Sequence, residues 1–437
     1  MKKLIEKITE ITDWYLKSSL FFKITIYLVV STSLAVITLL FIYSNCQCYI
    51  EKPTTEQSNK SQFLEEDELQ LESLGPDLGA SFIWEKAYYS SNNFYIHQKA
   101  KNRKIISQNG DITNVFVEKS DIYLVINDTK LYKYNTENNA ETYILSTTEP
   151  ILDIKIQLNQ KDIALLVEIS DHTPTNEDNA DLFVYNLETQ IINKITTLDS
   201  HFEIFNLGAW SLGEKNILYV ISHAGDAGHY RERIYKVNIL TKSVTIFQEF
   251  SNNLYEGGDS FWGIDEKGEY FIAESSKITT IGEEQHSFLV ESNLYKYNIK
   301  DLSAEVLIDF KKYFKDYFTD YKSLPWLDDI LYNENFDQIF LAAYIYNDQE
   351  ISNKSGLYQI KGNQIDKINV NFLFDSTNHF MFSLRATNNN FILYSNDTNS
   401  VKDKNKRAYK LYIYSLKEGK SSLVATGWNY MSFIGWL

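Results

Sequence analysis

Three side chains in the stretch HAGDAGH have the types and spacing of a small metal or proton-transfer centre. His223, Asp226 and His229 follow one another at intervals of three residues. Imidazole is the commonest protein ligand for metal ions, and it titrates near neutral pH. These residues are therefore the first candidates for a metal or catalytic centre. The competing interpretation is that they are surface residues of a polar loop.

Further candidate residues lie in long polar stretches that separate apolar segments of the chain. The stretches are 170–181, 222–233, 275–288, 347–356 and 396–410, whereas the other connections are turns of four or five residues. Long connecting loops carry binding residues more often than short turns do. If these loops share one rim of the fold, that rim is the expected interaction face. Its candidate residues are His172, Arg231, His286, Lys404 and Arg407.

No sequence motif assigns these residues to a known reaction. The HExxH, P-loop, GxGxxG and calcium-loop patterns are all missing. We therefore predict no cofactor, and a binding role is favoured over an enzymatic one. Of the seven histidines, only His97 is predicted to lie on a strand, so the others belong to the expected loops and connections.

Composition narrows the range of partners. The formal net charge of −16 argues against a nucleic-acid partner, because a phosphate-binding surface must be basic. Cys46 and Cys48 are the only cysteines, so neither a disulfide framework nor a cysteine-rich zinc site is expected. The two thiols could link two chains into a homodimer, although unpaired cysteines are the favoured interpretation.

An uncharged apolar run near the N-terminus predicts a membrane anchor. Residues 24–43 read ITIYLVVSTSLAVITLLFIY, and a helix of that length crosses about 30 Å of hydrocarbon. A cleaved signal peptide, the alternative, would have a shorter apolar region. Lysines are concentrated before the span, so the N-terminus is expected in the cytoplasm and the remainder in the periplasm or outside the cell. The expected parts are a basic amphipathic tail (1–23), a single-pass transmembrane helix (24–43), an acidic tether (44–79) and a folded domain (80–437).

One five-residue phrase recurs along the folded domain. LYKYN occurs at 131–135 and 294–298, with relatives LFVYN (182–186), IYKVN (234–238), LYQIK (357–361) and LYIYS (411–415). Each phrase alternates apolar and polar residues, which predicts a β-strand. A turn and a further strand follow it, and two strands joined by a tight turn precede it. One repeating unit is therefore four consecutive antiparallel strands.

Repeated four-stranded units are typical of a β-propeller, in which each blade buries its two faces against its neighbours. We predict an all-β, WD-repeat-like fold: a seven-bladed β-propeller of four-stranded antiparallel blades that follows an N-terminal transmembrane helix. FYIHQK (94–99) would be the third strand of the first blade. The last segment, MSFIGWL (431–437), is expected to supply the innermost strand of that blade and so close the ring.

Two segments resemble the turn of TolB-type β-propellers. WSLGEKNILYV (210–220) and GIDEKGEYFIA (263–273) are similar to the W-S-P-D-G-K-x-I-x-Y pattern of that family and of the propeller of dipeptidyl peptidase IV relatives. Neither segment matches SPDG in full, and the G-x-S-x-G nucleophile elbow of the peptidase relatives is missing. The resemblance covers about 80–437 and implies a propeller fold and a binding habit, not peptidase activity.

These patterns predict a membrane-anchored propeller that acts as a binding or scaffolding module at the cell envelope. The expected partner is a protein or peptide outside the cytoplasm. The alternative is a propeller enzyme, a glycan lyase or hydrolase with or without a metal ion, whose site lies on the rim of long loops. TolB-like lyase propellers are the precedent that the resemblance offers for this alternative.

Overall fold

The computed structural model describes the part of the chain after residue 69. The described ranges are 70–72, 75–87, 92–118, 121–157, 161–169, 180–198, 204–226, 229–253, 256–281, 286–313, 326–332, 338–344, 346–347, 350–351, 356–361, 364–367, 381–388, 390–399, 407–427 and 431–437. Chain contacts separate the residues up to Asp67 from a second unit, Glu68–Leu437. The predicted tail, the predicted span at 24–43, Cys46 and Cys48 lie outside the described residues. Within those ranges, no helix has the length and apolar character needed to cross a membrane.

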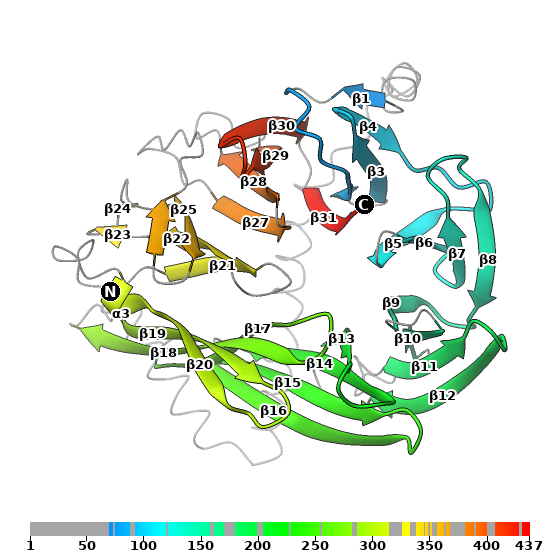
Figure 1. The fold of residues 1–437 in the computed structure, drawn as a ribbon, viewed down its shortest axis with the longest axis horizontal. Helices are drawn as coiled ribbons and strands as arrows, with labels where there is room; N and C mark the ends of the chain where they lie inside the picture. Colours follow the sequence, from blue (N-terminus) through cyan, green and yellow to red (C-terminus); the bar gives the residue numbers. More distant parts are fainter. Residues whose placement is uncertain are drawn as a thin grey trace, which may run out of the picture. The chain divides into compact units, whose positions relative to one another are not determined.

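The described residues form antiparallel sheets, most of them with four strands that follow one another along the chain (Figure 1). The first sheet has the order β1 (Gln70–Glu72), β4 (Lys101–Lys104), β3 (Asn92–Gln98), β2 (Phe82–Ala87) and β31 (Met431–Trp436). The second sheet is β5 (Ile112–Glu118), β6 (Asp121–Ile126), β7 (Lys130–Tyr134) and β8 (Glu141–Ser146). The third sheet is β9 (Ile151–Ile156), β10 (Asp162–Glu168), β11 (Ala180–Asn186) and β12 (Ile191–Leu198).

The middle of the chain forms one eight-stranded sheet. Its strands are β13 (Ile204–Trp210), β14 (Ile217–Asp226), β15 (His229–Asn238), β16 (Ser243–Asn253), β17 (Gly257–Ile264), β18 (Tyr270–Ile281), β19 (His286–Asn298) and β20 (Ala304–Asp309). Among the described residues, strand pairing between the two halves is confined to Asn252 and Asn253 of β16, which pair with Gly258 and Gly257 of β17. This junction requires glycine, because Gly257 has φ +85° and a Cβ there would lie 2.9 Å from the Cα of Lys277.

Two further four-stranded sheets follow. One contains β21 (Trp326–Tyr332), β22 (Ile339–Tyr344), β25 (Gly356–Lys361) and β26 (Gln364–Lys367), and the pair β23 (Tyr346–Asn347) and β24 (Glu350–Ile351) lies between β22 and β25 in sequence. The last sheet contains β27 (Met381–Thr387), β28 (Phe391–Asn399), β29 (Arg407–Ser415) and β30 (Lys420–Gly427). A short helix, α3 (Phe310–Tyr313), follows β20.

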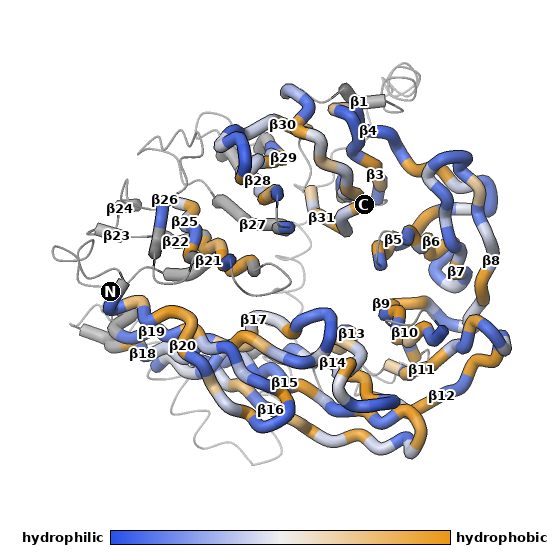
Figure 2. Tube along the Cα trace, in the orientation of Figure 1, coloured by the Kyte–Doolittle hydropathy of each residue, from blue (hydrophilic) through white to orange (hydrophobic). Residues whose placement is uncertain are grey.

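Burial along the strands shows why these sheets must stack. The second strand of a sheet is buried on both faces, as in β6 and β10, where five consecutive residues are buried. The fourth strand is exposed over its first half, as in β12, although two isoleucines begin that strand. Figure 2 shows the same contrast between apolar strands and polar turns. A sheet with a continuous apolar second strand has two faces to bury, so each sheet needs a neighbour on either side.

The hydrophobic clusters supply that packing in a closed order. Residues of the first and second sheets share one cluster, those of the second and third share the next, and the third packs on the first half of the eight-stranded sheet. The two halves of the eight-stranded sheet pack on each other, its second half packs on the β21 sheet, and that sheet packs on the last one. The last sheet packs on the first. Sheets that pack in a closed series around their first strands form a β-propeller.

The final strand of the chain completes the first sheet. β31 pairs antiparallel with β2, from Phe82 opposite Trp436 to Lys86 opposite Met431. The amide nitrogen of Leu437 adds a hydrogen bond of 3.0 Å to the carbonyl oxygen of Ser81. The prediction that 431–437 closes the ring is therefore confirmed, as is the assignment of 94–99 to the third strand of its sheet.

A one-residue bulge recurs in the first strand of each sheet, counted from the inside. The register against the second strand shifts between Ile112 and Asn114, Ile151 and Asp153, Leu207 and Ala209, Phe261 and Gly263, Leu327 and Asp329, Leu384 and Ala386, and Phe433 and Gly435. The residue before the bulge is apolar in every case. A bulge increases the local twist and bends the strand. Because the bulge recurs, the innermost strands share a common bend.

The recurring LYKYN phrase has a structural cause. Its last residue accepts hydrogen bonds from the amides of the following turn: Asn186 Oδ1 accepts from Glu188 and Thr189, at 3.1 and 2.8 Å. The turn then closes with Gln190 in the left-handed region, at φ 57°. Asparagine is suited to this position because its short side chain caps the turn that it begins. The phrase therefore marks a third strand and the turn that follows it.

The predicted long loops are shorter in the structure than expected. Much of 222–233 and 275–288 belongs to the hairpins β14–β15 and β18–β19, and β28 and β29 take residues from both ends of 396–410. The prediction that His97 is the only histidine on a strand is therefore wrong, since His223, His229 and His286 also lie on strands. Polar side chains misled the sequence interpretation, because an extended hairpin beyond the packed core needs no apolar alternation.

Candidate functional site

The β14–β15 hairpin contains the predicted metal candidates but does not bring all three together. Asp226 pairs with His229 next to the turn, and His223 pairs with Glu232 farther along the hairpin. His223 and Asp226 are three positions apart on one strand. Because successive strand residues alternate between faces, the hairpin places His223 on the opposite face from the Asp226–His229 pair.

His223 instead belongs to a hydrogen-bonded chain that connects two parts of the eight-stranded sheet. Its Nδ1 lies 2.8 Å from Oε1 of Glu232. The other carboxylate oxygen, Oε2, accepts a hydrogen bond of 2.7 Å from the backbone amide of Phe261. Phe261 is the residue before the bulge in β17. Glu232 therefore orients the imidazole and also holds the inner strand of the next half-sheet.

A second carboxylate makes the same kind of joint one sheet earlier. Asp153 Oδ2 accepts a hydrogen bond of 2.7 Å from the amide of Leu207, the residue before the bulge in β13. Its Oδ1 accepts from the amide of Ile154, at 2.8 Å. Burial raises the pKa of the Asp153 carboxyl to about 6, against the opposing effect of these two backbone hydrogen bonds. Asp153 and Glu232 thus satisfy equivalent amides on successive inner strands.

The other rim candidates lie partly in the described chain. Arg231 is on β15, His286 begins β19 and Arg407 begins β29. β15, β19 and β29 are each third strands of four, so their beginnings lie at the same end of their antiparallel sheets. His172 and Lys404 lie outside the described residues. The topology therefore gathers three of the five candidates at one end, where the long hairpins β14–β15 and β18–β19 also extend.

A groove of about 520 Å³ lies at the opposite end, between the two halves of the eight-stranded sheet. Its lining comes from the β13–β14 turn, the β17–β18 turn and the β19–β20 turn, together with Lys236: Ser211, Gly213, Glu214, Gly268, Glu269, Tyr270, Asn298, Ile299 and Lys300. The first two turns are the segments that resemble the TolB-type pattern. The sequence predicts short turns here, on the side opposite the long loops, and it predicts no groove.

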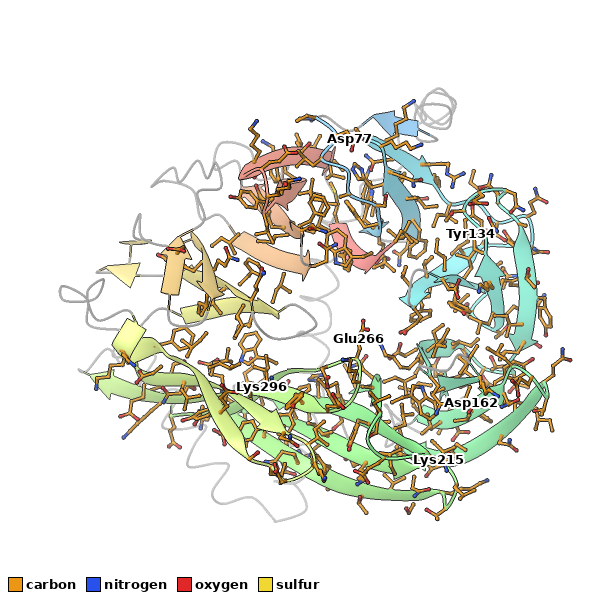
Figure 3. All side chains as sticks on the ribbon, viewed as in Figure 1. Asp77, Tyr134, Asp162, Lys215, Glu266 and Lys296 are labelled. Carbon is orange, nitrogen blue, oxygen red and sulfur yellow. The ribbon has the colours of Figure 1, made fainter. Side chains whose placement is uncertain are left out.

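The groove has a fixed pattern of charge. Lys236 Nζ contacts both carboxylate oxygens of Glu214, at 2.7 and 2.6 Å. Lys296 Nζ lies 4.1 Å from the centroid of the Tyr270 ring, a cation–π contact. Figure 3 shows Glu266 at the inner end of this sheet, toward the middle of the unit, whereas Lys215 and Lys296 lie farther out. The groove therefore offers polar and aromatic contacts rather than an apolar pocket.

Two buried ionisable side chains are engaged with neutral partners. Glu274 accepts hydrogen bonds from Ser292 Oγ at 2.6 Å and from Trp262 Nε1 at 3.2 Å, and burial raises the pKa of its carboxyl. His97 is buried against Phe82, and desolvation lowers its pKa. In both cases desolvation disfavours the charged form of the side chain.

The described chain contains no group of three or more His, Cys, Asp or Glu side chains placed to hold a metal ion. The histidine with the most suitable surroundings for chemistry is His223, whose Nδ1 is occupied by Glu232 and whose side chain is 43% exposed. A carboxylate at one ring nitrogen fixes the tautomer and leaves the other nitrogen to accept a proton or bind a ligand. This arrangement can support proton transfer, but it needs partners from a substrate or from other segments.

Sequence reasoning missed Glu232 and Asp153, the residues that join neighbouring sheets. Each is an acidic residue inside a strand, at RERIYK and ILDIKI. The acid among the apolar residues of ILDIKI is a signal, because a buried carboxylate must find hydrogen-bond donors, whereas RERIYK is charged on both sides of Glu232 and gives none. That signal does not reveal the donors, which are amides of strands about 30 to 50 residues farther along the chain.

Among known proteins, this chain is similar only to solved three-dimensional structures. Neither a protein-family model nor a curated protein matches this chain. A puromycin-hydrolysing peptidase of Mycobacterium tuberculosis is similar, with a TM-score of 0.48 and 8% identity over 82% of this chain and 53% of that one. An oligogalacturonate lyase of Vibrio parahaemolyticus gives 0.41 and 12% identity over 66% and 74% of the two chains. TolB of Acinetobacter baumannii gives 0.34 and 13% identity over 82% and 81%. At these values the likenesses assign neither a family nor a function.

Proposed function

We propose that this chain is a membrane-anchored β-propeller that binds a protein or peptide outside the cytoplasm. It would be anchored by residues 24–43, with the N-terminus in the cytoplasm and the propeller in the periplasm or outside the cell. The observation that carries this proposal is the convergence of Arg231, His286 and Arg407 at one end of their sheets, where two hairpins extend. Extended hairpins with exposed polar residues are suited to contact a large partner.

The use of the acidic side chains also supports a binding role. Asp153 and Glu232 are bound to inner-strand amides, and Glu274 is bound to Ser292 and Trp262. A general acid or base must reach a substrate proton. Asp153 and Glu232 instead hold neighbouring sheets or half-sheets together, and Glu274 links strands within one half-sheet.

We further propose that the ring has seven blades. The eight-stranded sheet would be two blades of four strands, between which the described strand pairing is limited to the short β16–β17 contact. The repeated bulge supports this count, since it recurs in each first strand from β5 to β31, including both β13 and β17. Seven hydrophobic clusters, one between each two consecutive blades, support the same number.

The binding role can be tested by site-specific photo-crosslinking in native membranes. A photoreactive residue at Tyr230, which is 49% exposed on the β14–β15 hairpin, should give a discrete protein adduct. Ile191 is similarly exposed (55%) and begins the fourth strand β12, so it lies at the opposite end of its sheet and is the matched control position. Adducts of equal yield at both positions, or none at Tyr230, would contradict the proposal.

The second candidate function is an enzyme of glycans or peptides, and one observation favours it. Glu232 orients the imidazole of His223, as a carboxylate orients a general-base histidine. A screen of acidic and neutral glycans and of peptides would test it, with the loss of turnover in His223→Gln as the criterion. If no turnover is detected, or if His223→Gln leaves it unchanged, this second candidate fails without affecting the binding proposal.

A further inference from the structure

Residues 70–72 and 75–80 lie across the joint between the first and last sheets. β1 adds to the outer edge of the first sheet, where Gln70, Leu71 and Glu72 pair with Arg103, Asn102 and Lys101. The chain then reaches the outer strand of the last sheet, where Ser422 Oγ donates a hydrogen bond of 2.7 Å to the carbonyl oxygen of Pro76. A single short segment therefore contacts both sheets that the ring must join.

The contact with the last sheet is close enough to require glycine. A Cβ at Gly75 would collide with Ser422 Oγ and would lie 2.8 Å from the backbone nitrogen of Leu423. Real Cβ atoms do not approach other atoms so closely, so any side chain at this position must lift the segment off β30. Gly75 thus fits the segment against the outer strand of the last sheet.

The residues that follow Pro76 add apolar contacts between the first and last sheets. Leu78 packs against the cluster shared by the first and last sheets, and Ala80 is 3% exposed within it. The cluster contains Trp84 and Tyr95 from the first sheet and Leu411 and Val424 from the last. Removing these side chains from water stabilises the seam as a unit.

The strand beneath β1 carries the polar link between the two sheets. Asn102, opposite Leu71, donates through Nδ2 to the carbonyl oxygen of Val424 at 2.9 Å. Its Oδ1 accepts from Trp84 Nε1 at 3.1 Å and from His97 Nδ1 at 2.9 Å. β1 therefore covers the edge of the strand whose buried side chain fastens the first sheet to the last.

From these contacts we propose that residues 70–72 and 75–80 form a latch that locks the seam of the propeller. Displacing the latch from β4 and β30 removes the outer cover of the joint and leaves β31 and Asn102 to hold it. Because the latch is the last part of the predicted tether (44–79), a pull or a partner acting on the preceding part of the tether would loosen this joint first. The segment is then a conformational element, not a passive spacer between membrane and propeller.

Hydrogen exchange of the full-length chain tests the latch at the seam itself. Gly75→Val should raise the exchange rate of the amides in Met431–Trp436 and Phe82–Ala87 by about tenfold or more, because local opening governs exchange. The amides of the third sheet should keep their wild-type rates. Gly213→Val is the matched control, since a Cβ there meets nothing within 4 Å.

A milder variant keeps the test decisive if Gly75→Val does not fold. Ser422→Ala deletes only the hydrogen bond to Pro76 and should raise exchange at the same amides by a smaller factor. Faster exchange confined to the seam supports the latch. Wild-type rates at the seam in both variants, or an increase spread evenly over all sheets, would overturn it.

Discussion

The side-chain amide of Asn102 donates a hydrogen bond of 2.9 Å to the carbonyl oxygen of Val424, 322 positions farther along the chain. The same side chain accepts from Trp84 Nε1 and His97 Nδ1. Because a carbonyl oxygen only accepts, the shared Oδ1 requires that His97 carries its proton on Nδ1. One buried asparagine therefore satisfies three groups from both sides of the seam.

Asn102→Ala should be strongly destabilising. It leaves the indole nitrogen of Trp84 and the carbonyl oxygen of Val424 buried without these partners, and each unsatisfied group costs about 1–3 kcal/mol. We expect the free energy of unfolding in urea to fall by about 2–4 kcal/mol. Asn109→Ala, which removes an exposed asparagine bound to Glu141, is the control and should cost less than about 1 kcal/mol. Equal losses in the two variants would contradict the assigned role.

Gly435→Ala should weaken the joint between the first and second sheets by overpacking. Gly435 lies on β31 at the bulge, and a Cβ there would collide with the side chain of Val117 on β5. Overpacking of this kind costs about 1–3 kcal/mol. Val117→Gly in the same chain should recover part of the loss, because it removes Cβ, Cγ1 and Cγ2, the atoms that collide. A double-mutant cycle by urea unfolding measures this recovery; strictly additive effects would argue against the contact.

The recurring phrase and the closing strand could be predicted because they depend on local pattern. Alternation in LYKYN marks a strand, its asparagine marks a turn, and the spare strand at 431–437 is needed by the first sheet. The hydrogen bonds that join neighbouring sheets could not be predicted. Asp153 and Glu232 accept them from amides on other sheets or half-sheets, and the sequence around the two acids does not identify those amides. The position at which β14 ends could not be predicted from the sequence either, because Ser222–Asp226 continues the strand without an alternation of apolar and polar residues.

The candidate site shows the same division. The residue types of HAGDAGH are those of a metal centre, but only the register of β14 and β15 reveals that His223 pairs with Glu232 and not with Asp226 or His229. The groove beside Lys236 also needed the structure, because three turns distant in sequence form it. The sequence pattern predicts the strands and turns, whereas the strand register and the packing determine which side chains come into contact.

The carboxyl of Asp153 should make stability depend on pH in a defined direction. Its folded-state pKa is about 6, above the ordinary value of 3.8, so the folded chain binds the proton more tightly than the unfolded chain. Between about pH 4 and pH 6 the contribution of this group to stability therefore decreases as the pH rises. The free energy of unfolding of the wild type, minus that of Asp153→Asn, should fall across this interval. Urea unfolding at several pH values tests this, and a difference that is constant with pH would refute it.

Glu232 should matter more to stability than the histidine that it orients. Glu232→Ala frees the amide of Phe261 as well as His223, and so weakens the joint between the two halves of the eight-stranded sheet. We expect a loss of about 2–3 kcal/mol for Glu232→Ala and less than about 1 kcal/mol for His223→Ala, because only the first leaves a backbone donor unsatisfied. Glu249→Ala, which removes a more exposed partner of Arg233, is the control for loss of an ion pair. Equal costs for Glu232→Ala and His223→Ala would mean that the carboxylate serves the imidazole alone, and would favour the catalytic alternative over the structural joint.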